Sequence, residues 1–320
     1  MNTRDPFIRA LTGDDSAQTV TLQRQYRASV AELWNALTTP DRIARWYGTI
    51  IGPVPRAVGD EFRVDIGGGM IRRAVLERCE APNALVYTWW SGDDDPGLVQ
   101  LQLESLGDDE TSLRVQHDRL RPHRMIGYGG GWEHNLVALA DAVGATREPE
   151  VSGDVRGQRW ELLRAHPLEV ELSIDAPLAR VWAAWSSADG LAAWWWRHWD
   201  DVAIEADVRP GGSYLIEAPS HGITVSGEYL VVDPERRLAF TWLWTDGDDP
   251  IRDEAVDVTF RATGGATSVV VRHTGPWDTD APAESYRQGW EFVLTELARR
   301  MSDPAAVRRT GGVRETRGTY

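Results

Sequence analysis

Apolar and polar residues alternate in two short stretches of the chain, VTLQRQYR at 20–27 and LEVELSI at 168–174. A period of two is typical of a strand with one buried face. A helix signal follows each stretch: Ser29 and Glu32 form an S-x-x-E capping box, and Pro177 suits a first helical turn. The pattern therefore predicts a strand followed by a helix at two distant places in the chain.

Several further strands and one long helix are expected after each of these helices. A second short helix should start near Pro40 and Asp41, and again near Asp189, before the strands begin. The expected strands, separated by Gly, Asp and Pro turns, span 60–66, 70–79, 84–90, 98–105 and 111–118, and then 212–217, 222–232, 238–244, 254–261 and 267–273. Trp132, Leu136, Leu139 and Val143, like Trp290, Leu294 and Leu297, form an apolar stripe at helical spacing. This order predicts an α+β fold, with an antiparallel sheet that carries its helices on one side.

The two halves of the chain also agree in sequence. VAELWNALTTPDRIARWYG (30–48) aligns with LARVWAAWSSADGLAAWWW (178–196), and YGGGWEHNL aligns with YRQGWEFVL. Three shorter blocks recur between these two, in the same order in both halves. VGDEF aligns with PGGSY, LVYTWW aligns with LAFTWLW, and TSLRVQHD aligns with TSVVVRHT. Five blocks in one order indicate a duplication, and a repeat of this length indicates tandem domains rather than a solenoid. We expect two copies of one domain, at 19–144 and 167–301.

The segments outside the two copies have a different composition. Residues 145–166 are rich in Gly, Pro and charge at their start, as linkers tend to be, whereas Trp160, Leu162 and Leu163 should dock on one of the domains. Residues 1–18 and 302–320 are expected to be tails, the second of them disordered.

Composition and charge exclude several classes of function. The 320 residues carry a formal net charge of −15, and no stretch resembles the basic footprint of a nucleic-acid-binding protein. An acidic surface also disfavours anionic membranes. No apolar run is long enough to span a membrane, the N-terminus does not resemble a signal peptide, and Cys79 is the only cysteine. We therefore expect a cytoplasmic protein with neither nucleic acid nor membrane as a partner.

Both copies resemble the START-like superfamily, also called SRPBCC or polyketide-cyclase-like, and within it the activator-of-heat-shock-ATPase branch. The resemblance rests on VWAAWSSADGLAAWW, PGGSY, LAFTWLW, TSVVVRH and GWEFVLTEL, and on their counterparts in the first copy, which has GDEF in place of the Gly-Gly turn. It implies a duplicated helix-grip fold, in which a curved antiparallel β-sheet surrounds a long C-terminal α-helix. Members of this superfamily bind diverse apolar molecules, and some catalyse cyclisation or dehydration or contact a chaperone.

Aromatic and histidine residues shared by the copies are candidates for lining a cavity between sheet and helix. The candidate ligand-binding residues are Trp46, Trp89, His117, Tyr128 and Trp132 in the first copy and Trp195, Trp196, Trp242, His273, Tyr286 and Trp290 in the second. Packing in the core is the alternative for the tryptophans and histidines, and the helix dipole is the alternative for the repeated acids Glu133 and Glu291. One histidine per copy without a second ligand is a poor metal site, so we expect neither metal nor cofactor.

The chain lacks a P-loop, GxSxG, HExxH and zinc spacing. The first hypothesis is therefore a binding protein rather than an enzyme, with one apolar cavity per copy for a small hydrophobic or aromatic molecule. One alternative is a cyclase or dehydratase that uses His or Tyr in the same cavity. Another is an interaction module that modulates a chaperone ATPase in a stress response. One copy could also be degenerate and only support the other.

Overall fold

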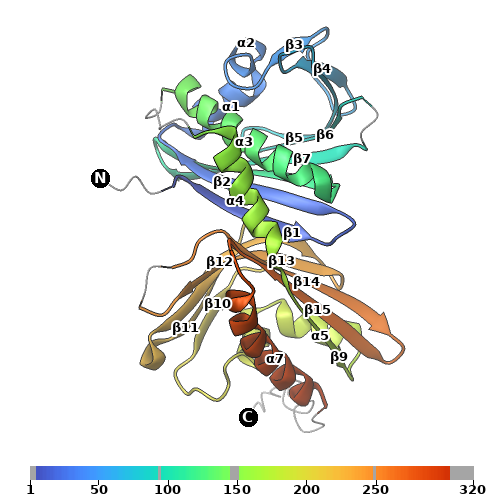
Figure 1. Cartoon of the computed structure of the whole chain (residues 1–320), viewed down its shortest axis with the longest axis vertical. Helices are drawn as coiled ribbons and strands as arrows, with labels where there is room; N and C mark the ends of the chain where they lie inside the picture. The colour runs from blue at the N-terminus through green and yellow to red at the C-terminus, as the bar shows by residue number, and fades with distance from the viewer. Residues whose placement is uncertain (1–4, 93–94, 145–150, 248–249, 303–320) are drawn as a thin grey trace, which may run out of the picture. The chain divides into compact units, whose positions relative to one another are not determined.

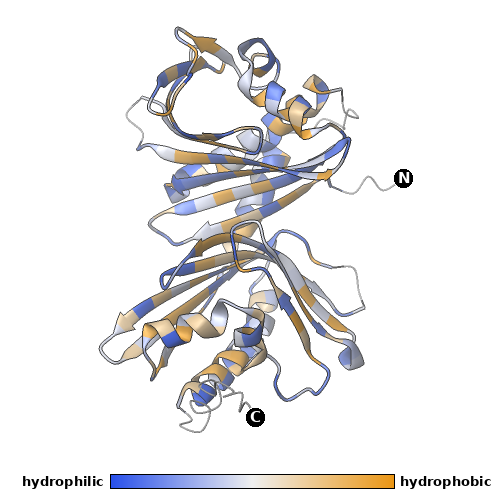
Figure 2. Ribbon diagram, turned by 180° about the vertical axis from the view of Figure 1, so that it is seen from behind, coloured by the Kyte–Doolittle hydropathy of each residue, from blue (hydrophilic) through white to orange (hydrophobic). Residues whose placement is uncertain are grey.

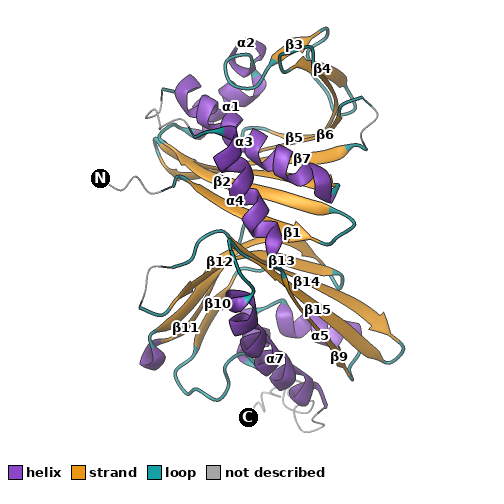
Figure 3. Cartoon of the chain, in the orientation of Figure 1, coloured by secondary structure: helices purple, strands orange, loops and turns teal. Residues whose placement is uncertain are grey.

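The computed structural model describes residues 5–92, 95–144, 151–247 and 250–302 (Figure 1). The chain divides into two compact units, Met1–Ala165 and His166–Tyr320, here called domain 1 and domain 2. Each domain contains one antiparallel sheet and one long helix, so the α+β helix-grip fold and its duplication are confirmed (Figure 3).

Domain 1 contains an eight-stranded sheet in the order β1-β2-β8-β7-β6-β5-β4-β3, in which every neighbouring pair is antiparallel. Its strands are β1 Phe7–Gly13, β2 Gln18–Tyr26, β3 Thr49–Ile51, β4 Glu61–Asp65, β5 Ile71–Glu80, β6 Ala84–Trp90, β7 Gly97–Gly107 and β8 Glu110–Leu120. Its helices are α1 Val30–Thr38, α2 Pro40–Ile43, α3 Pro122–Ala142 and α4 Gly153–Ala165. The sheet is strongly curved, and β3 and β4 turn back toward α1 and α2 (Figure 1).

Domain 2 contains a seven-stranded sheet in the order β10-β11-β12-β13-β14-β15-β9. Its strands are β9 Leu168–Ile174, β10 Ala203–Ala206, β11 Ser213–Ala218, β12 Ile223–Asp233, β13 Arg237–Thr245, β14 Glu254–Thr263 and β15 Ala266–Thr274. Its helices are α5 Leu178–Trp185, α6 Ala188–Ala192, the short 3₁₀ helix Pro219–His221 and α7 Ala281–Ser302. The long helix α7 packs against β9 and β15.

The two domains repeat individual hydrogen bonds as well as elements. The Trp46 indole donates to the carbonyl of Ala36 at 3.0 Å, and the aligned Trp194 donates to Ala184 at 2.9 Å. Each bond ties the end of the helical segment back to the first helix. Both tryptophans are buried, so the shared Trp spacing is explained by the same local packing in both copies.

The alternation of hydrophobic and hydrophilic residues along the strands places one face of each sheet in a core (Figure 2). In β2, Val20 and Leu22 are fully buried, and Trp132 and Leu136 present the apolar stripe of α3 to the same core. The sequence pattern therefore identified the strand and helix faces that meet.

The start of the chain differs from the expectation of a tail over residues 1–18. Phe7–Gly13 form the edge strand β1, which pairs with β2 from Phe7–Arg24 to Gly13–Gln18. β1 is buried on both faces: Arg9 and Leu11 lie on one face, Ala10 and Thr12 lie on the other, and all four are buried. A strand buried on both faces lacks the two-residue alternation by which strands are recognised. Residues 1–4 and 303–320 lie outside the described residues.

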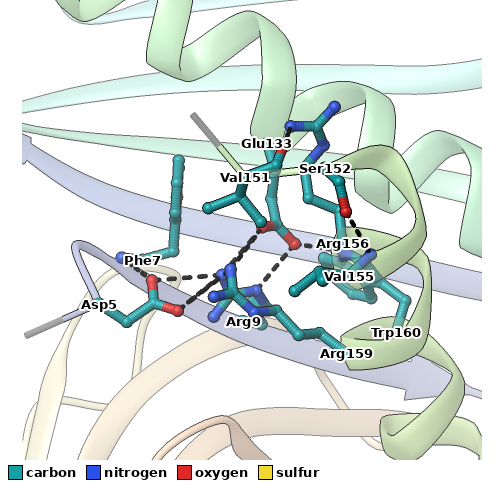
Figure 4. Close-up of polar contacts among 10 residues, drawn as sticks. All are labelled: Asp5, Phe7, Arg9, Glu133, Val151, Ser152, Val155, Arg156, Arg159 and Trp160. Atoms are coloured by element: carbon teal, nitrogen blue, oxygen red, sulfur yellow. Dashed lines mark hydrogen bonds and ion pairs between the residues drawn. The ribbon is translucent and has the colours of Figure 1, made fainter. Parts of the chain in front are cut away.

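Helix α4 lies within the expected linker and packs against α3 and β1 of domain 1 (Figure 4). Trp160 is fully buried and sits against Gly129, where a Cβ atom would lie 2.4 Å from the indole ring. This close approach requires glycine at position 129. The expectation that Trp160 and Leu163 dock on a domain therefore agrees with their burial, while residues 145–150 lie outside the described residues.

Glu133 connects α3 to both β1 and α4 (Figure 4). It is 1% exposed, and its carboxylate accepts hydrogen bonds from the Arg9 guanidinium at 2.9 Å and from the Trp160 indole at 2.7 Å. Because α3 begins at Pro122, Glu133 does not lie in the first helical turn. The helix dipole therefore does not explain Glu133, and a buried ion pair does.

Candidate functional site

A cavity of about 250 Å³ lies in domain 1 between the curved sheet and the α1–α2 segment. Its lining residues are Trp34, Leu37, Thr38, Ile43, Trp46, Tyr47, Ile50, Val54, Pro55, Arg56, Phe62, Val64, Leu76, Cys79, Ala81, Leu85, Tyr87, Trp89 and Leu101. Aromatic and aliphatic side chains dominate this set, as in sites for small apolar molecules.

The cavity has a buried aromatic wall and an exposed mouth. Tyr47 stacks on Trp89 with ring centroids 5.4 Å apart, and Phe62 meets Tyr87 edge-on at 6.2 Å. Trp89 and Tyr87 are buried, whereas Val54, Arg56 and Cys79 are exposed. The exposed residues lie in the β3–β4 loop and at the end of β5, so a ligand would enter between these two segments.

The same place in domain 2 is almost filled. A void of only about 10 Å³ remains there, close to the space of one water molecule. Its lining residues are Trp185, Leu191, Trp195, Tyr214, Ile216, Tyr229, Leu238, Phe240 and Trp242. In the repeat these correspond to Leu37, Ile43, Tyr47, Phe62, Val64, Leu76, Leu85, Tyr87 and Trp89, all of which line the cavity of domain 1. At this place the described residues of domain 2 leave no room for a ligand, so the cavity expected in the second copy is not found there.

Five of these nine positions carry a larger side chain in domain 2, and at three of them a ring is added or enlarged. Domain 2 has Trp185 in place of Leu37 and Trp195 in place of Tyr47. It also has Tyr229 in place of Leu76, because Tyr229 pairs with Phe240 as Leu76 pairs with the aligned Tyr87. The Trp185 ring packs 6.4 Å from Trp195, and Trp195 packs 5.6 Å from the Trp290 ring of α7. Larger side chains at equivalent positions thus occupy the space that domain 1 leaves open.

The structure separates the candidate residues into two groups. Trp46 and Trp89 line the cavity of domain 1, and Trp195 and Trp242 line the small void of domain 2. The other candidates line neither space but pack beside one of the two. They are His117, Tyr128, Trp132, Trp196, His273, Tyr286 and Trp290.

His117 lies between two of the candidate tryptophans. The Trp89 indole nitrogen is 3.2 Å from Nε2 of His117, and the Trp132 indole nitrogen is 3.2 Å from Nδ1. Burial, followed by the nearby Arg72 charge, lowers the pKa of His117 to about 3. A neutral imidazole has one acceptor nitrogen, so only one indole donates to it at a time. These contacts favour a structural histidine that positions Trp89 in the cavity wall.

His273 has a similar place in domain 2. The Trp290 indole donates to its Nδ1 at 3.3 Å, and burial lowers the pKa of His273 to about 3. Neither Nε2 of His273 nor the Trp242 indole nitrogen has a hydrogen-bond partner among the described residues. The fully buried ring therefore serves packing in domain 2, as it does in domain 1.

The two candidate tyrosines hydrogen-bond to different kinds of side chain. Arg72 donates to the Tyr128 hydroxyl at 3.0 Å in domain 1, whereas the Tyr286 hydroxyl donates to Glu254 at 2.9 Å in domain 2. Glu254 takes the place of Gly97, because each pairs with the equivalent tryptophan of the neighbouring strand. Burial raises the pKa of Glu254 to about 7, although hydrogen bonds from Trp277 and Tyr286 act in the opposite direction.

Glu254→Gln is expected to remove a pH dependence from the stability of domain 2. The folded chain keeps the proton on Glu254 up to about pH 7, and the unfolded chain loses it near the ordinary value of 4.5. The unfolded state therefore binds fewer protons between these values, and the free energy of unfolding falls as pH rises, by about 1.4 kcal/mol per pH unit. Urea unfolding at pH 5 and pH 8 measures this difference.

His273 titrates with the opposite sign below about pH 6.5, but it is present in both proteins. The difference between wild type and Glu254→Gln therefore isolates the carboxyl. The variant should gain stability relative to wild type as pH rises from 5 to 8. Equal differences at both pH values would show that the folded state does not hold this proton.

Sequence reasoning missed most of the aromatic wall, namely Trp34, Tyr47, Phe62 and Tyr87. Two signals were present. Tyr87 alternates with Trp89 along one strand and therefore shares its face, and Tyr47 is aligned with Trp195, which was itself a candidate.

Other kinds of site find little support in the described part of the chain. Across residues 5–92, 95–144, 151–247 and 250–302, no group of three or more His, Cys, Asp or Glu side chains could hold a metal ion. No helix in these ranges combines the length and the apolar character that a membrane span requires.

Comparison with solved structures gives relatives from several bacteria. CalU16 from Micromonospora echinospora is 26% identical, with a TM-score of 0.40, over 48% of this chain and 94% of its own. DynU16, a protein in the dynemicin biosynthetic locus, is 19% identical, with a TM-score of 0.38, over 92% of this chain and 100% of its own. MLL2253 from Mesorhizobium loti is 27% identical, with a TM-score of 0.36, over 39% of this chain and 96% of its own. No curated protein matches this chain.

The sequence model of one family matches the chain twice. It is described as Activator of Hsp90 ATPase homolog 1-like protein, and it matches residues 27–144 and 175–302. These two matches cover most of the chain, and each lies within one of the two domains. The chain therefore belongs to the family of Activator of Hsp90 ATPase homolog 1-like proteins, and it carries the family's domain twice.

Proposed function

We propose that domain 1 binds a small aromatic molecule in its cavity and that domain 2 does not bind one. The observation that carries this proposal is the contrast between about 250 Å³ of space in domain 1 and about 10 Å³ at the equivalent place in domain 2. Domain 2 then has the same fold but no space for a ligand at the equivalent place.

The size of the cavity sets the class of ligand. A dry cavity of about 150 Å³ is known to hold benzene, so the space in domain 1 suits a molecule of two or three fused rings. Such a molecule would bury roughly 300 Å² of apolar surface and gain about 7 kcal/mol, from which the cost of association is subtracted. We therefore expect a dissociation constant no tighter than about micromolar.

The wall favours flat molecules over aliphatic ones of the same volume. Trp46, Tyr47 and Trp89 present rings to the cavity, with centroids between 5.3 and 5.4 Å apart for the neighbouring pairs. Offset and edge contacts between rings contribute about 0.5–1.5 kcal/mol beyond the burial of area.

The single cysteine offers a test that reports on domain 1 alone. Cys79 is exposed and lines the mouth of the cavity, and domain 2 has no cysteine. Two- and three-ring aromatics that quench tryptophan fluorescence should also slow the alkylation of Cys79 by iodoacetamide, with the same dissociation constant in both assays.

A matched aliphatic molecule, perhydrofluorene, is the control for the aromatic ligand fluorene. It should protect Cys79 less well at equal free concentration, because it cannot stack on Trp89. If neither fluorescence nor Cys79 alkylation responds to any aromatic compound of this size, domain 1 is not a receptor for such molecules.

A further inference from the structure

One hydroxyl group opens into the cavity of domain 1 without a hydrogen-bond partner. It belongs to Tyr87, which lines the cavity from β6 together with Leu85 and Trp89 on the same face of the strand. Among the described residues this hydroxyl makes no hydrogen bond, and, unlike the Tyr47 hydroxyl, it is not sealed from water. Tyr87 is only 8% exposed, so the open part of its side chain faces the cavity rather than the outer surface.

The side chains around Tyr87 do not supply the missing partner. Phe62 meets its ring edge-on at 6.2 Å, the Trp89 ring lies 5.8 Å away, and Leu76 is its cross-strand neighbour. The Trp89 indole nitrogen is itself a donor and lies against His117. A buried hydroxyl without a partner is unfavourable, so a ligand oxygen that accepts its proton would remove that cost.

Domain 2 has no hydroxyl at this position. Phe240 aligns with Tyr87, and it pairs with Tyr229 across the sheet as Tyr87 pairs with Leu76. Phe240 lines the small void that remains there. The open hydroxyl therefore occurs in the copy that has space for a ligand, and phenylalanine is compatible with the same strand of the same fold.

A neutral carbonyl oxygen suits this hydroxyl better than other polar groups. Burial raises the pKa of Tyr87 above its ordinary value, so the hydroxyl keeps its proton at neutral pH and can donate it. A carbonyl oxygen needs only a donor, whereas a ligand hydroxyl would need an acceptor for its own proton, and Phe62, Leu76 and Trp89 offer none. A carboxylate or phenolate would bury a charge among these apolar side chains.

We propose that the molecule bound by domain 1 is an aromatic ketone or quinone, whose carbonyl oxygen accepts a hydrogen bond from the Tyr87 hydroxyl. This inference rests on the proposed function, because it names the chemical class of the molecule that the cavity takes. The rings of the molecule fill the space beside Trp46 and Trp89, while its oxygen reaches Tyr87. A hydrocarbon of the same shape would fill the space but leave the hydroxyl unpaired.

Fluorenone and fluorene are suitable test ligands, since they differ only by a carbonyl in place of a methylene group. Isothermal titration of the full chain with each gives two dissociation constants for wild type and two for Tyr87→Phe. The ratio of the constant for fluorene to that for fluorenone should fall by roughly three- to tenfold in Tyr87→Phe, as expected for one net hydrogen bond. Comparing ratios removes the difference in hydrophobicity between the two ligands.

Two controls show that a change in the ratio comes from the lost hydrogen bond. Fluorene should bind Tyr87→Phe at least as well as wild type, because the substitution removes an unpaired polar group from an apolar cavity. Tyr26→Phe removes a buried hydroxyl of domain 1 that lies outside the cavity and donates to the Leu136 carbonyl at 3.0 Å. This variant should leave the ratio unchanged.

Infrared spectroscopy provides a second measurement that does not depend on the folding of a variant. The carbonyl stretching band of fluorenone bound to wild type should lie at lower frequency than in hexane, because a hydrogen bond to the oxygen weakens the C=O bond. In Tyr87→Phe the band should return toward its position in hexane.

An unchanged ratio in Tyr87→Phe, or a carbonyl band of bound fluorenone at its hexane position in wild type, would overturn the inference and leave the proposed function standing. Failure of both ligands to bind wild type, with no protection of Cys79, would overturn the proposed function and the inference with it.

Discussion

Leu37→Trp is expected to abolish the binding of aromatic ligands without unfolding the protein. Leu37 lines the cavity of domain 1, and domain 2 already has tryptophan at the corresponding position 185. The larger ring should therefore enter the empty space in the orientation that Trp185 adopts. The affinity for fluorene, measured by titration and by Cys79 alkylation, should fall by at least about 100-fold, since most of the burial of the ligand is lost.

The reverse substitution is the matched control. Trp185→Leu should open space in domain 2 and destabilise that domain by about 2 to 4 kcal/mol, because truncating a buried tryptophan leaves a cavity. Binding by domain 1 should be unaffected. If Leu37→Trp retains the wild-type affinity while its thermal unfolding is unchanged, the ligand does not occupy the space beside Leu37.

Glu133→Ala is expected to destabilise domain 1 by about 3 kcal/mol, since it leaves the buried Arg9 guanidinium with only the part-exposed Asp5 as a charge partner. Arg9 is 2% exposed, and its Nε lies 2.9 Å from the Glu133 carboxylate. The Trp160 indole would lose its acceptor as well, so α4 should detach more readily from α3. Urea unfolding of the full chain measures the loss, and hydrogen exchange should show faster exchange in Gly153–Ala165.

Glu291→Ala provides a control at the aligned position of domain 2. Glu291 occupies the same place in the repeat but is exposed, so its replacement should change the free energy of unfolding by no more than about 0.5 kcal/mol. Equal effects of the two substitutions would show that the buried ion pair does not stabilise domain 1.

The duplication and most of the strands could be predicted from the sequence, because both depend on local patterns. The observed β6 Ala84–Trp90 coincides with the expected 84–90, and β15 Ala266–Thr274 differs from 267–273 by one residue at each end. The edge strand β1 escaped prediction because its burial on both faces gives no alternation. The buried contacts of Glu133 could not be predicted, because its partners Arg9 and Trp160 come from distant parts of the chain.

The difference between the two interiors could not be predicted in the same way. Aligned tryptophans such as Trp89 and Trp242 suggested two similar cavities, but the volume of a cavity depends on the sum of many side chains around it. Leu37 and Trp185, like Tyr47 and Trp195, could have been recognised as aligned positions of unequal size. How these differences change the volume of the cavity depends on how the sheet packs against α1 and α2. The sequence pattern alone does not show this packing.

Domain 1 keeps an apolar space at a place where larger side chains fill domain 2. Diffraction from crystals of the full chain under xenon pressure tests this most directly, because xenon binds in dry apolar cavities. We predict xenon beside Leu37 and Trp89, and none beside Trp185 and Trp242. Xenon in both domains, or none in domain 1, would contradict the account.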